Sequence, residues 1–406
     1  MADVAEPLEH PAASHVPRRA WHVLGVAVIA QFGFSIIEQG MPTLTGFIKE
    51  DFGISAAAAG LLVSSLAFGK ILGSYAAGLI ADRMGERLVL VGGGLATGVL
   101  LAVAMASPLP VLLALLFLAG IASAGATPAG GRLVLLAFPR NRRGLALGIR
   151  QTGVPIGGVV GALLLPWIAH TAGWRWSLAV AGMILAVAVL PLAHSKAGGR
   201  VRELIEPAPH LWPGTDRNIR LLTLWACLLV TGQFSVLAFL ALDLHESAHL
   251  SLPAASLLVA VAQGAGVAGR VLWGVFSDRA VAHGRKPQLL ALTAVGLLAV
   301  LLLLAVPRSV PTAVLVAVAA LVGFALMGFQ GLWITVLAET AGPDRVGAAT
   351  GLAVTFVIAS AALAPPLYGL AADVAGTYRA VWAVLAVVLA AAFIPAVLLQ
   401  EPEGQA

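Results

Sequence analysis

Residues 78–87 read Gly-Leu-Ile-Ala-Asp-Arg-Met-Gly-Glu-Arg, and residues 274–279 read Gly-Val-Phe-Ser-Asp-Arg. Both stretches place a glycine four residues before an Asp-Arg pair, and the two aspartates, Asp82 and Asp278, lie about half a chain length apart. Each stretch ends a long apolar run and opens a polar turn. A motif that recurs once, at the same point of two apolar runs, indicates a chain built as two related halves.

Three further groups of residues repeat in the same order in both halves. They are Arg143-Gly144 with Gly148 against Arg345, Gly347 and Gly351, Trp174-Arg175 against Tyr378-Arg379, and Gln31-Phe32 against Gln233-Phe234. Internal repeats of this length are typical of membrane carriers.

The composition points to lipid as the solvent. Of 406 residues, 60% are hydrophobic and 11% are charged, and the mean hydropathy is +0.96. A soluble protein carries roughly a quarter charged residues. The net charge of +5 sits in the connections, so it reports membrane topology and not nucleic-acid binding. The single cysteine, Cys227, cannot form an internal disulfide and is interpreted as an apolar filler.

Apolar runs long enough to cross the hydrocarbon core, about 20 residues each, predict an all-α membrane protein. The twelve expected spans are 21–48, 55–81, 87–106, 109–137, 144–168, 174–193, 219–243, 252–279, 288–306, 311–340, 345–371 and 377–400. The expected organisation is a disordered cytoplasmic tail (1–20), a six-helix half (21–193), a cytoplasmic linker (194–218), a second six-helix half (219–400) and a short cytoplasmic tail (401–406).

The charges of the connections predict the orientation. With a cytoplasmic N-terminus, sixteen Lys and Arg residues fall in connections on the cytoplasmic side. The four on the other side are Lys49, Arg175, Arg308 and Arg379. Because cytoplasmic loops are enriched in Lys and Arg, both termini are expected in the cytoplasm, with the protein in the cytoplasmic (inner) membrane.

The motif at residues 78–87, with its degenerate copy at 274–279, resembles the signature loop of the major facilitator superfamily, and the resemblance extends over residues 20 to 400. The resemblance implies two pseudo-symmetric six-helix bundles that rock about a central site, and a monomer. It also implies that these loops latch the halves together on the cytoplasmic side. The expected gating residues are Gly78, Asp82, Arg83, Gly85, Arg87, Arg132, Gly274, Asp278 and Arg279. A carboxylate at Asp82 can cap a helix of the other half.

Two observations complicate this latch. Glu86 stands where the family usually has a basic residue, which is expected to weaken it. Arg132 can instead be an arginine that reaches from a helix end to the membrane surface.

Four charged residues within the spans stand clear of the loop ends: Glu38, Lys70, Arg150 and Arg270. Charges inside a membrane are costly and are functional candidates by default. At 1.5 Å per residue, Lys70 lies about 18 Å before Asp82 and Arg270 about 12 Å before Asp278. Arg150, about 9 Å into its span, can still reach the surface.

Helical spacing groups several polar residues. Gln31, Ser35 and Glu38 form a stripe on one face of the first span, and Gln263 and Arg270 share a face of the eighth. The resemblance places spans one, four, seven and ten around the central cavity. Of the polar residues near the midplane, Gln31, Glu38, Gln233 and Gln330 belong to those spans. For each glutamine, an interhelical hydrogen bond is the alternative interpretation.

The balance of intramembrane charge favours an anionic solute. The eighth span resembles that of organic-anion carriers in the superfamily, in which an arginine at the place of Arg270 binds the solute carboxylate. The expected solute-binding residues are Lys70, Arg270, Arg150, Gln31, Gln233 and Gln330. Glu38 is the expected site of proton coupling, which makes protons the second transported species. A static Glu38–Lys70 ion pair is the alternative.

The main rival function is a proton-driven exporter of drugs or metabolites. Residues 153–158, Gly-Val-Pro-Ile-Gly-Gly, contain the residues of an exporter motif with the proline displaced by one position, while Lys70 and Arg270 argue against a cationic solute. An enzyme is not expected, since the spans contain no metal-ligand cluster. The chain also lacks a phosphate-binding Walker loop, so neither a cofactor nor ATP is implied.

Overall fold

A computed structural model describes residues 16–139, 142–194, 216–279, 285–307, 310–342 and 346–400. Within these residues all regular structure is helical, and twelve helical segments are long and apolar enough to cross a membrane. The predicted fold class is confirmed. Residues 1–15 of the predicted tail (1–20), the predicted tail at 401–406 and residues 195–215 of the predicted linker (194–218) lie outside the described residues. The helices extend into the first tail and the linker, over Arg18–Ala20, His194 and Arg217–Asn218.

The first six spans run from Arg18 to His194. Their elements are α1 (Arg18–Gly40), η1 (Met41–Leu44), α2 (Thr45–Phe52), α3 (Ala56–Met84), α4 (Glu86–Ala104), α5 (Leu109–Ser123), α6 (Ala126–Ala137), α7 (Arg143–Gln151), α8 (Gly153–Ala172) and α9 (Trp174–His194). The first span comprises α1, η1 and α2, and the fifth comprises α7 and α8.

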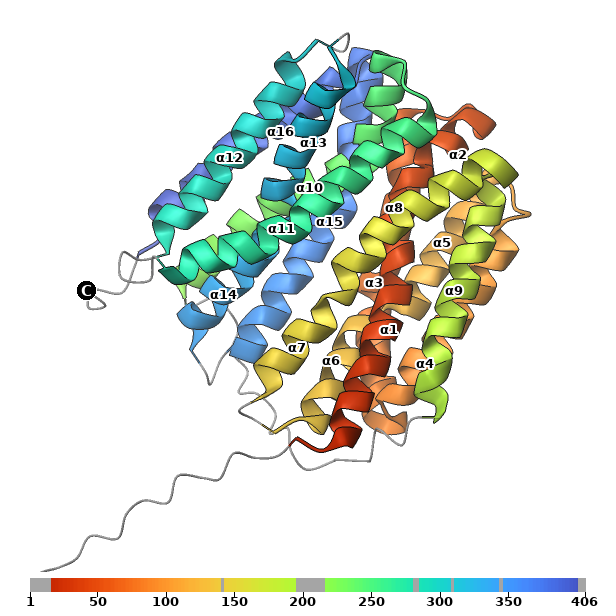
Figure 1. Cartoon of the computed structure of the whole chain (residues 1–406), viewed down its shortest axis with the longest axis vertical. Helices are drawn as coiled ribbons and strands as arrows, with labels where there is room; N and C mark the ends of the chain where they lie inside the picture. Colours follow the sequence, from red (N-terminus) through yellow and green to blue (C-terminus); the bar gives the residue numbers. More distant parts are fainter. Residues whose placement is uncertain are drawn as a thin grey trace, which may run out of the picture.

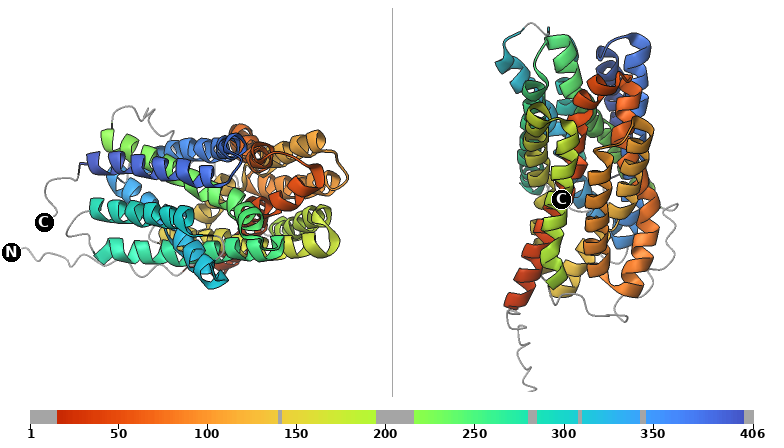
Figure 2. Two further views of the ribbon diagram at one scale, coloured as in Figure 1. Left: turned by 90° about the horizontal axis from the view of Figure 1, so that it is seen from above. Right: turned by 90° about the vertical axis from the view of Figure 1, so that its right-hand side faces the viewer.

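The last six spans repeat this arrangement from Arg217 to Leu398. Their elements are α10 (Arg217–Ala248), α11 (Leu252–Arg279), α12 (Lys286–Ala305), α13 (Thr312–Leu326), α14 (Phe329–Ala341), α15 (Val346–Ala375) and α16 (Arg379–Leu398). The two groups of helices lie side by side (Figures 1 and 2).

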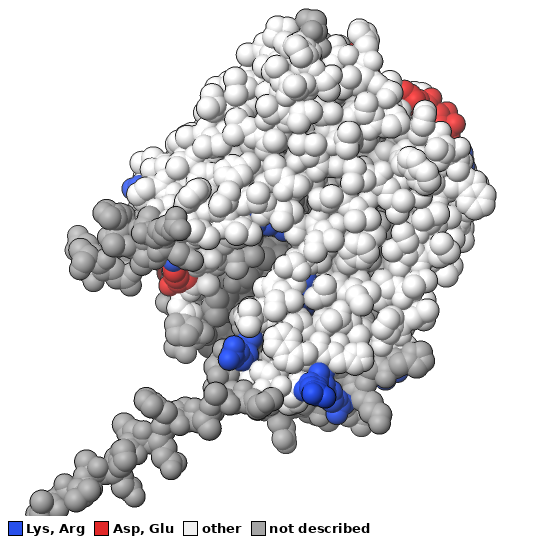
Figure 3. All heavy atoms as spheres, in the orientation of Figure 1, with Lys and Arg blue, Asp and Glu red and all other residues white. Residues whose placement is uncertain are grey.

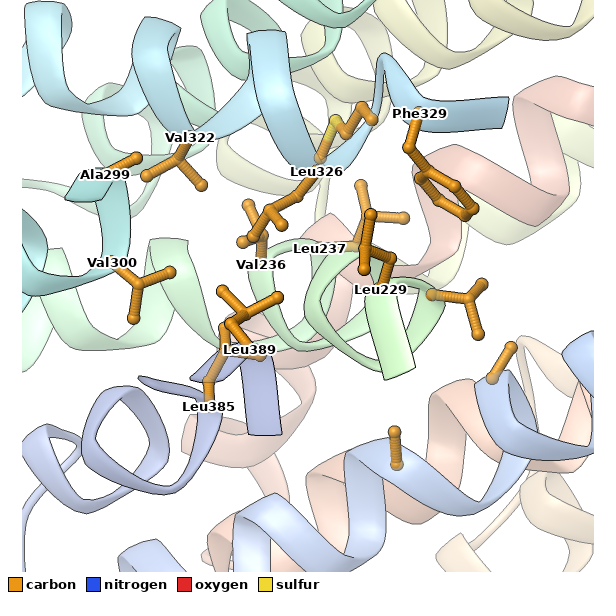
Figure 4. Packing of buried hydrophobic residues seen from close by; sticks show 14 of the residues in the cluster. Leu229, Val236, Leu237, Ala299, Val300, Val322, Leu326, Phe329, Leu385 and Leu389 are labelled. Atoms are coloured by element: carbon orange, nitrogen blue, oxygen red, sulfur yellow. The ribbon is translucent and has the colours of Figure 1, made fainter. Parts of the chain in front are cut away.

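Each half has its own apolar core. One buried cluster draws its residues from positions 20–192, and the other almost entirely from positions 219–399. In the second core, side chains of α10 such as Leu229 and Val236 pack against Leu326 of α13 and Leu389 of α16 (Figure 4). Large apolar side chains such as Leu72 and Val387 point outward, as expected where lipid is the solvent.

Spans four and ten are broken near their middles, which the sequence analysis did not predict. The helix stops at Ser123 and restarts at Ala126 in span four, and it stops at Leu326 and restarts at Phe329 in span ten. A glycine lies in each break, Gly125 and Gly328. Breaks release backbone carbonyls from the helical hydrogen-bond ladder, and within a membrane those carbonyls need other donors.

The halves meet along two pairs of helices: α3 packs along α15, and α8 packs along α11. Glycines bring the first pair close together. A Cβ on Gly60 would lie 2.4 Å from the carbonyl oxygen of Pro365, and one on Gly369 would lie 2.4 Å from that of Ala56. At this end of the molecule α2 also contacts α10. We call this region, where α2, the C-terminal end of α10 and the α15–α16 connection meet, the clasp end.

Close packing within a half yields a stability prediction. A Cβ on Gly120 of α5 would lie 2.1 Å from the carbonyl oxygen of Leu66 in α3, whereas one on Gly92 of α4 meets nothing within 4 Å. Gly120→Ala should therefore lower the free energy of unfolding by about 1–3 kcal/mol because two backbones must separate. Gly92→Ala is the matched control and should leave it unchanged or raise it. Thermal unfolding in detergent measures both, and equal effects would contradict the packing argument.

Candidate functional site

Arg270 lies in a pocket between the two halves. The residues that line this pocket are Gln39 of α1, Val154 and Pro155 of α8, Gln233 of α10, Gln263, Gly266, Val267 and Arg270 of α11, and Met327 in the break of span ten. Side chains from both halves therefore face one space in the interior of the bundle. The space-filling view shows a hollow between the halves with Lys or Arg atoms inside it (Figure 3).

The Arg270 guanidinium is held by the break in span ten. Its Nε donates a hydrogen bond to the carbonyl oxygen of Met327 at 3.0 Å. This contact requires a close approach of α11, which Gly269 provides, because a Cβ there would lie 2.2 Å from the carbonyl oxygen of Phe324. Among the described residues, no carboxylate lies within ion-pair distance of Arg270. Its charge is left for another partner.

Gln263 connects the halves next to this arginine. Its Nε2 donates to the carbonyl oxygen of Gly158 at 3.0 Å and, more weakly, to that of Gln39 at 3.4 Å. Gly158 is needed at this point, because a Cβ there would lie 2.2 Å from Gln263 Oε1. Gln263 and Arg270 both line the pocket, as their spacing on α11 predicts.

Gln233 and Gln330 form an interhelical pair. Gln330 Nε2 donates to Gln233 Oε1 at 3.1 Å, and Gln233 is only 2% exposed. This is the hydrogen bond named above as the alternative to a solute contact. Gln233 also lines the pocket, so one side of the pair faces the same space as Arg270.

Glu38 and Lys70 form an ion pair between α1 and α3, in which Lys70 Nζ contacts Glu38 Oε1. The two side chains are 20% and 16% exposed respectively. The structure thus contains the ion pair that the sequence left as an alternative to an isolated coupling carboxylate. Glu38 also interacts electrostatically with Arg150, so one acid stands among two bases in this half.

Arg150 is buried and does not extend to the membrane surface, since it is 2% exposed. Its Nη2 donates to Gln31 Oε1 at 2.5 Å and to the carbonyl oxygen of Ala126 at 2.7 Å. Gln31 Nε2 in turn donates to Ser35 at 3.2 Å, which follows the predicted polar stripe. Arg150 therefore connects the start of α6, directly after the break in span four, to α1, and neither it nor Gln31 is among the residues that line the pocket.

The expected latch is described only in part. Gly85, with φ of 90°, ends α3, and Arg83 and Arg87 are exposed. Arg132 pairs with Glu86 of its own half at 2.9 Å. Gly78 and Gly274 each have room for a Cβ. The side chains of Asp82, Asp278 and Arg279 lie outside the described residues.

Several ion pairs and hydrogen bonds at the clasp end were not predicted from the sequence. Lys49 of α2 pairs with Glu246 of α10 at 2.6 Å, and Glu50 pairs with His245 at 2.8 Å. The carboxylate of Asp373 accepts hydrogen bonds from the backbone N–H groups of Ala56 and Ala57, both at 2.8 Å, at the N-terminus of α3. All of these contacts join one half to the other. In the sequence these residues appear only as a group of charges near span ends, a pattern that is equally typical of solvated loops.

Acidic groups gather around Tyr378 at the clasp end. Burial, followed by the charge of Glu246 and those of Asp373 and Asp243, raises the pKa of the Tyr378 hydroxyl well above its ordinary value. The hydroxyl therefore stays protonated and donates to Glu246 Oε1 at 3.3 Å. Asp243 is fully buried and accepts a hydrogen bond from the Trp382 indole at 2.8 Å. The sequence reading placed Asp243 at a span end, but α10 continues to Ala248.

A family model described as Major Facilitator Superfamily matches residues 23–357, with a second match over residues 222–406. The chain belongs to this superfamily. An uncharacterised transporter of this family from Mycobacterium tuberculosis is 31% identical over 371 residues, which cover 90% of the chain and 82% of that relative. The family and these relatives are transporters and not enzymes.

Two further relatives are named for organic acids. A probable galactarate/D-glucarate transporter of Bacillus subtilis is 24% identical over 82% of the chain and 81% of its own length. A gentisate transporter of Corynebacterium glutamicum is 27% identical over 83% of the chain and 78% of its own length. Among solved structures, a bacterial homologue of the human lysosomal transporter Spinster, in an inward-facing and occupied conformation, superposes with a TM-score of 0.77 at 16% identity, covering 95% of this chain and 96% of that one. That likeness supports the fold of this family member.

The Glu38–Lys70 pair gives a second prediction. Glu38→Gln or Lys70→Gln alone leaves the partner's charge unpaired in a largely dehydrated site. The two single substitutions should therefore together lower the free energy of unfolding by more than the double substitution does. The expected coupling energy is about 1–3 kcal/mol. A double-mutant cycle on the thermal unfolding of the purified protein measures it. Additive effects of the two substitutions would mean that the pair contributes no coupling.

Proposed function

We propose that the protein carries a small organic anion across the cytoplasmic membrane by alternating access, coupled to protons. The observation that carries this proposal is the Arg270 guanidinium, which lines a pocket between the halves and has no carboxylate partner among the described residues. A cation left unpaired inside a membrane protein is costly unless a ligand completes its coordination. An anionic solute would do so.

The chemistry of the pocket suits a carboxylate. A guanidinium presents parallel N–H groups to the two oxygens of a carboxylate, and Arg270 uses only Nε for the protein. The amides of Gln39, Gln233 and Gln263 line the same space and can bond hydroxyl or further carboxyl groups of a solute. The relatives named for galactarate, D-glucarate and gentisate support the same class of solute, since all three are carboxylates.

The Glu38–Lys70 pair offers a route for proton coupling. Protonation of Glu38 neutralises the acid and frees the charge of Lys70, which then attracts an anion. Binding of an anion to Lys70 in turn leaves Glu38 free to take up a proton. Because such couplings are reciprocal, proton and anion should promote each other's binding, which gives symport.

An exporter of cationic drugs has less support. Such an exporter would use Glu38 to attract a cation, but Lys70 already occupies this carboxylate. Arg270, the charged residue among those that line the pocket, would repel a cationic solute. The distribution of Lys and Arg further supports cytoplasmic termini, so that the clasp end faces outward.

The anion site is tested by Arg270→Gln. Loss of a charge-assisted hydrogen bond should lower the affinity for D-glucarate or gentisate roughly 10- to 100-fold. Arg270→Lys keeps the charge but lacks the planar pair of N–H groups, so its affinity should lie between those of the wild type and Arg270→Gln. Isothermal titration or ligand-induced thermal stabilisation measures the effect, with Arg220→Gln, an exposed arginine at the start of α10, as the control. Binding of lipophilic cations instead of carboxylates would refute the proposal.

Proton coupling is tested separately by Glu38→Gln. In proteoliposomes, uptake of the anion by the wild type should rise as the outer pH is lowered and should be accompanied by proton entry. The glutamine variant cannot exchange a proton, so it should still bind the anion but lose the pH-driven uptake. Unchanged proton entry in the variant would assign the coupling to another group.

A further inference from the structure

His245, at the clasp end of α10, contacts two hydrogen-bond acceptors at once. Its Nδ1 lies 2.6 Å from the backbone carbonyl oxygen of Leu250, and its Nε2 lies 2.8 Å from Glu50 Oε1. A carbonyl and a carboxylate can only accept hydrogen bonds. Both ring nitrogens must therefore carry a hydrogen for both contacts to be favourable, and an imidazole with two N–H groups is a cation.

The two contacts of His245 differ in what they join. The bond to Leu250 stays inside the second half, where it anchors the ring at the end of α10. The contact with Glu50 crosses to α2 in the first half. After the loss of one proton the ring has a single N–H group. The remaining hydrogen stays on Nδ1, because Nδ1 makes the shorter contact, with Leu250. Nε2 then turns a lone pair toward the carboxylate, so that an attraction between the halves becomes a repulsion.

We propose that His245 is a proton-binding site that controls the clasp: the proton on its ring holds α10 to α2, and release of that proton loosens the closed end. The adjacent Lys49–Glu246 pair reinforces the contact with the opposite arrangement of charges, a base on α2 and an acid on α10. The bonds of Asp373 to the N-terminus of α3 complete the closure. The proposal concerns the clasp alone and does not depend on which solute is carried.

The sign of the effect follows from the direction of titration. Histidine changes charge between about pH 5 and 8, so the clasp should be strongest below this range and weaken as the pH rises through it. His245 and Glu50 are 31% and 56% exposed, so water and protons on that side reach the pair directly. Acid at the clasp end therefore favours the state closed at that end.

Other titratable groups surround the clasp. Those on α10 and on the elements packed against its end are Lys49, Glu50, Asp51, Asp243, Glu246, His249, Asp373, Tyr378 and Arg379. Apart from His249, none is of a type that ordinarily titrates between pH 6 and 8. The His249 side chain is exposed and makes no hydrogen bond or ion pair with the described residues, which makes it a matched control four residues from His245.

The test measures the distance between the halves at the clasp end as a function of pH. Spin labels on Ala106→Cys and Thr312→Cys, two exposed positions at corresponding turns of the two halves, report it in a Cys227→Ser background. The full chain is placed in lipid nanodiscs without solute. The ratio of closed to open distances should fall roughly two- to five-fold between pH 5.5 and 8.5, because a partly exposed ion pair is modest in strength.

Variants separate His245 from its surroundings. His245→Gln should remove the pH dependence, Glu50→Gln should reduce it strongly, and His245→Arg should keep the clasp closed across the whole range. His249→Asn should behave like the wild type. If His245→Gln retains the pH dependence, if His249→Asn removes it, or if the wild type shows none, the proposal is wrong. Solute binding by the same samples reports on the proposed anion site independently.

Discussion

The structure depends on a rule of the membrane interior, namely that every backbone polar group needs a partner inside the protein. The helices of spans four and ten are interrupted in the middle of the bundle, and an arginine donates a hydrogen bond at each interruption. Arg150 donates to the carbonyl of Ala126, the first residue of α6, and Arg270 donates to that of Met327, inside the interruption of span ten. These carbonyl acceptors help to accommodate two guanidinium groups inside the bundle. They also fix both groups in position, because a backbone carbonyl moves far less than a side chain.

The two arginines then diverge in what surrounds them. Arg150 lies against Gly130, bonds Gln31 and interacts with Glu38, so its environment is filled by protein. Arg270 uses one nitrogen for the break, and no described carboxylate lies within ion-pair distance of it. Two residues of the same type, at similar depth, thus serve different purposes: one organises a half, and the other is left available at the interface between halves. The groups that surround each arginine therefore decide whether its guanidinium is available to a ligand.

The sequence predicted the architecture well for a physical reason. Apolar runs of fixed length are imposed by the bilayer, so they can be recognised without knowledge of packing. The orientation that the distribution of Lys and Arg indicates stays a prediction. The breaks in spans four and ten were missed because glycines are common in membrane helices. The sequence could not decide whether Glu38 pairs with Lys70, because spacing along one helix does not show which face the neighbouring helix turns toward it. The contacts of Asp373 and His245 depend on two halves meeting, which no local pattern encodes.

The proposed alternating access requires that closure at either end be reversible. The cores of the halves are extensive and draw almost entirely on separate stretches of the chain. At the clasp end the halves are joined by the close packing of α3 on α15, and also by a few partly exposed ion pairs and one carboxylate on a helix N-terminus, each of modest strength in contact with water. The apolar packing carries no titratable group, whereas the ion pairs can respond to the protons that the carrier is proposed to use.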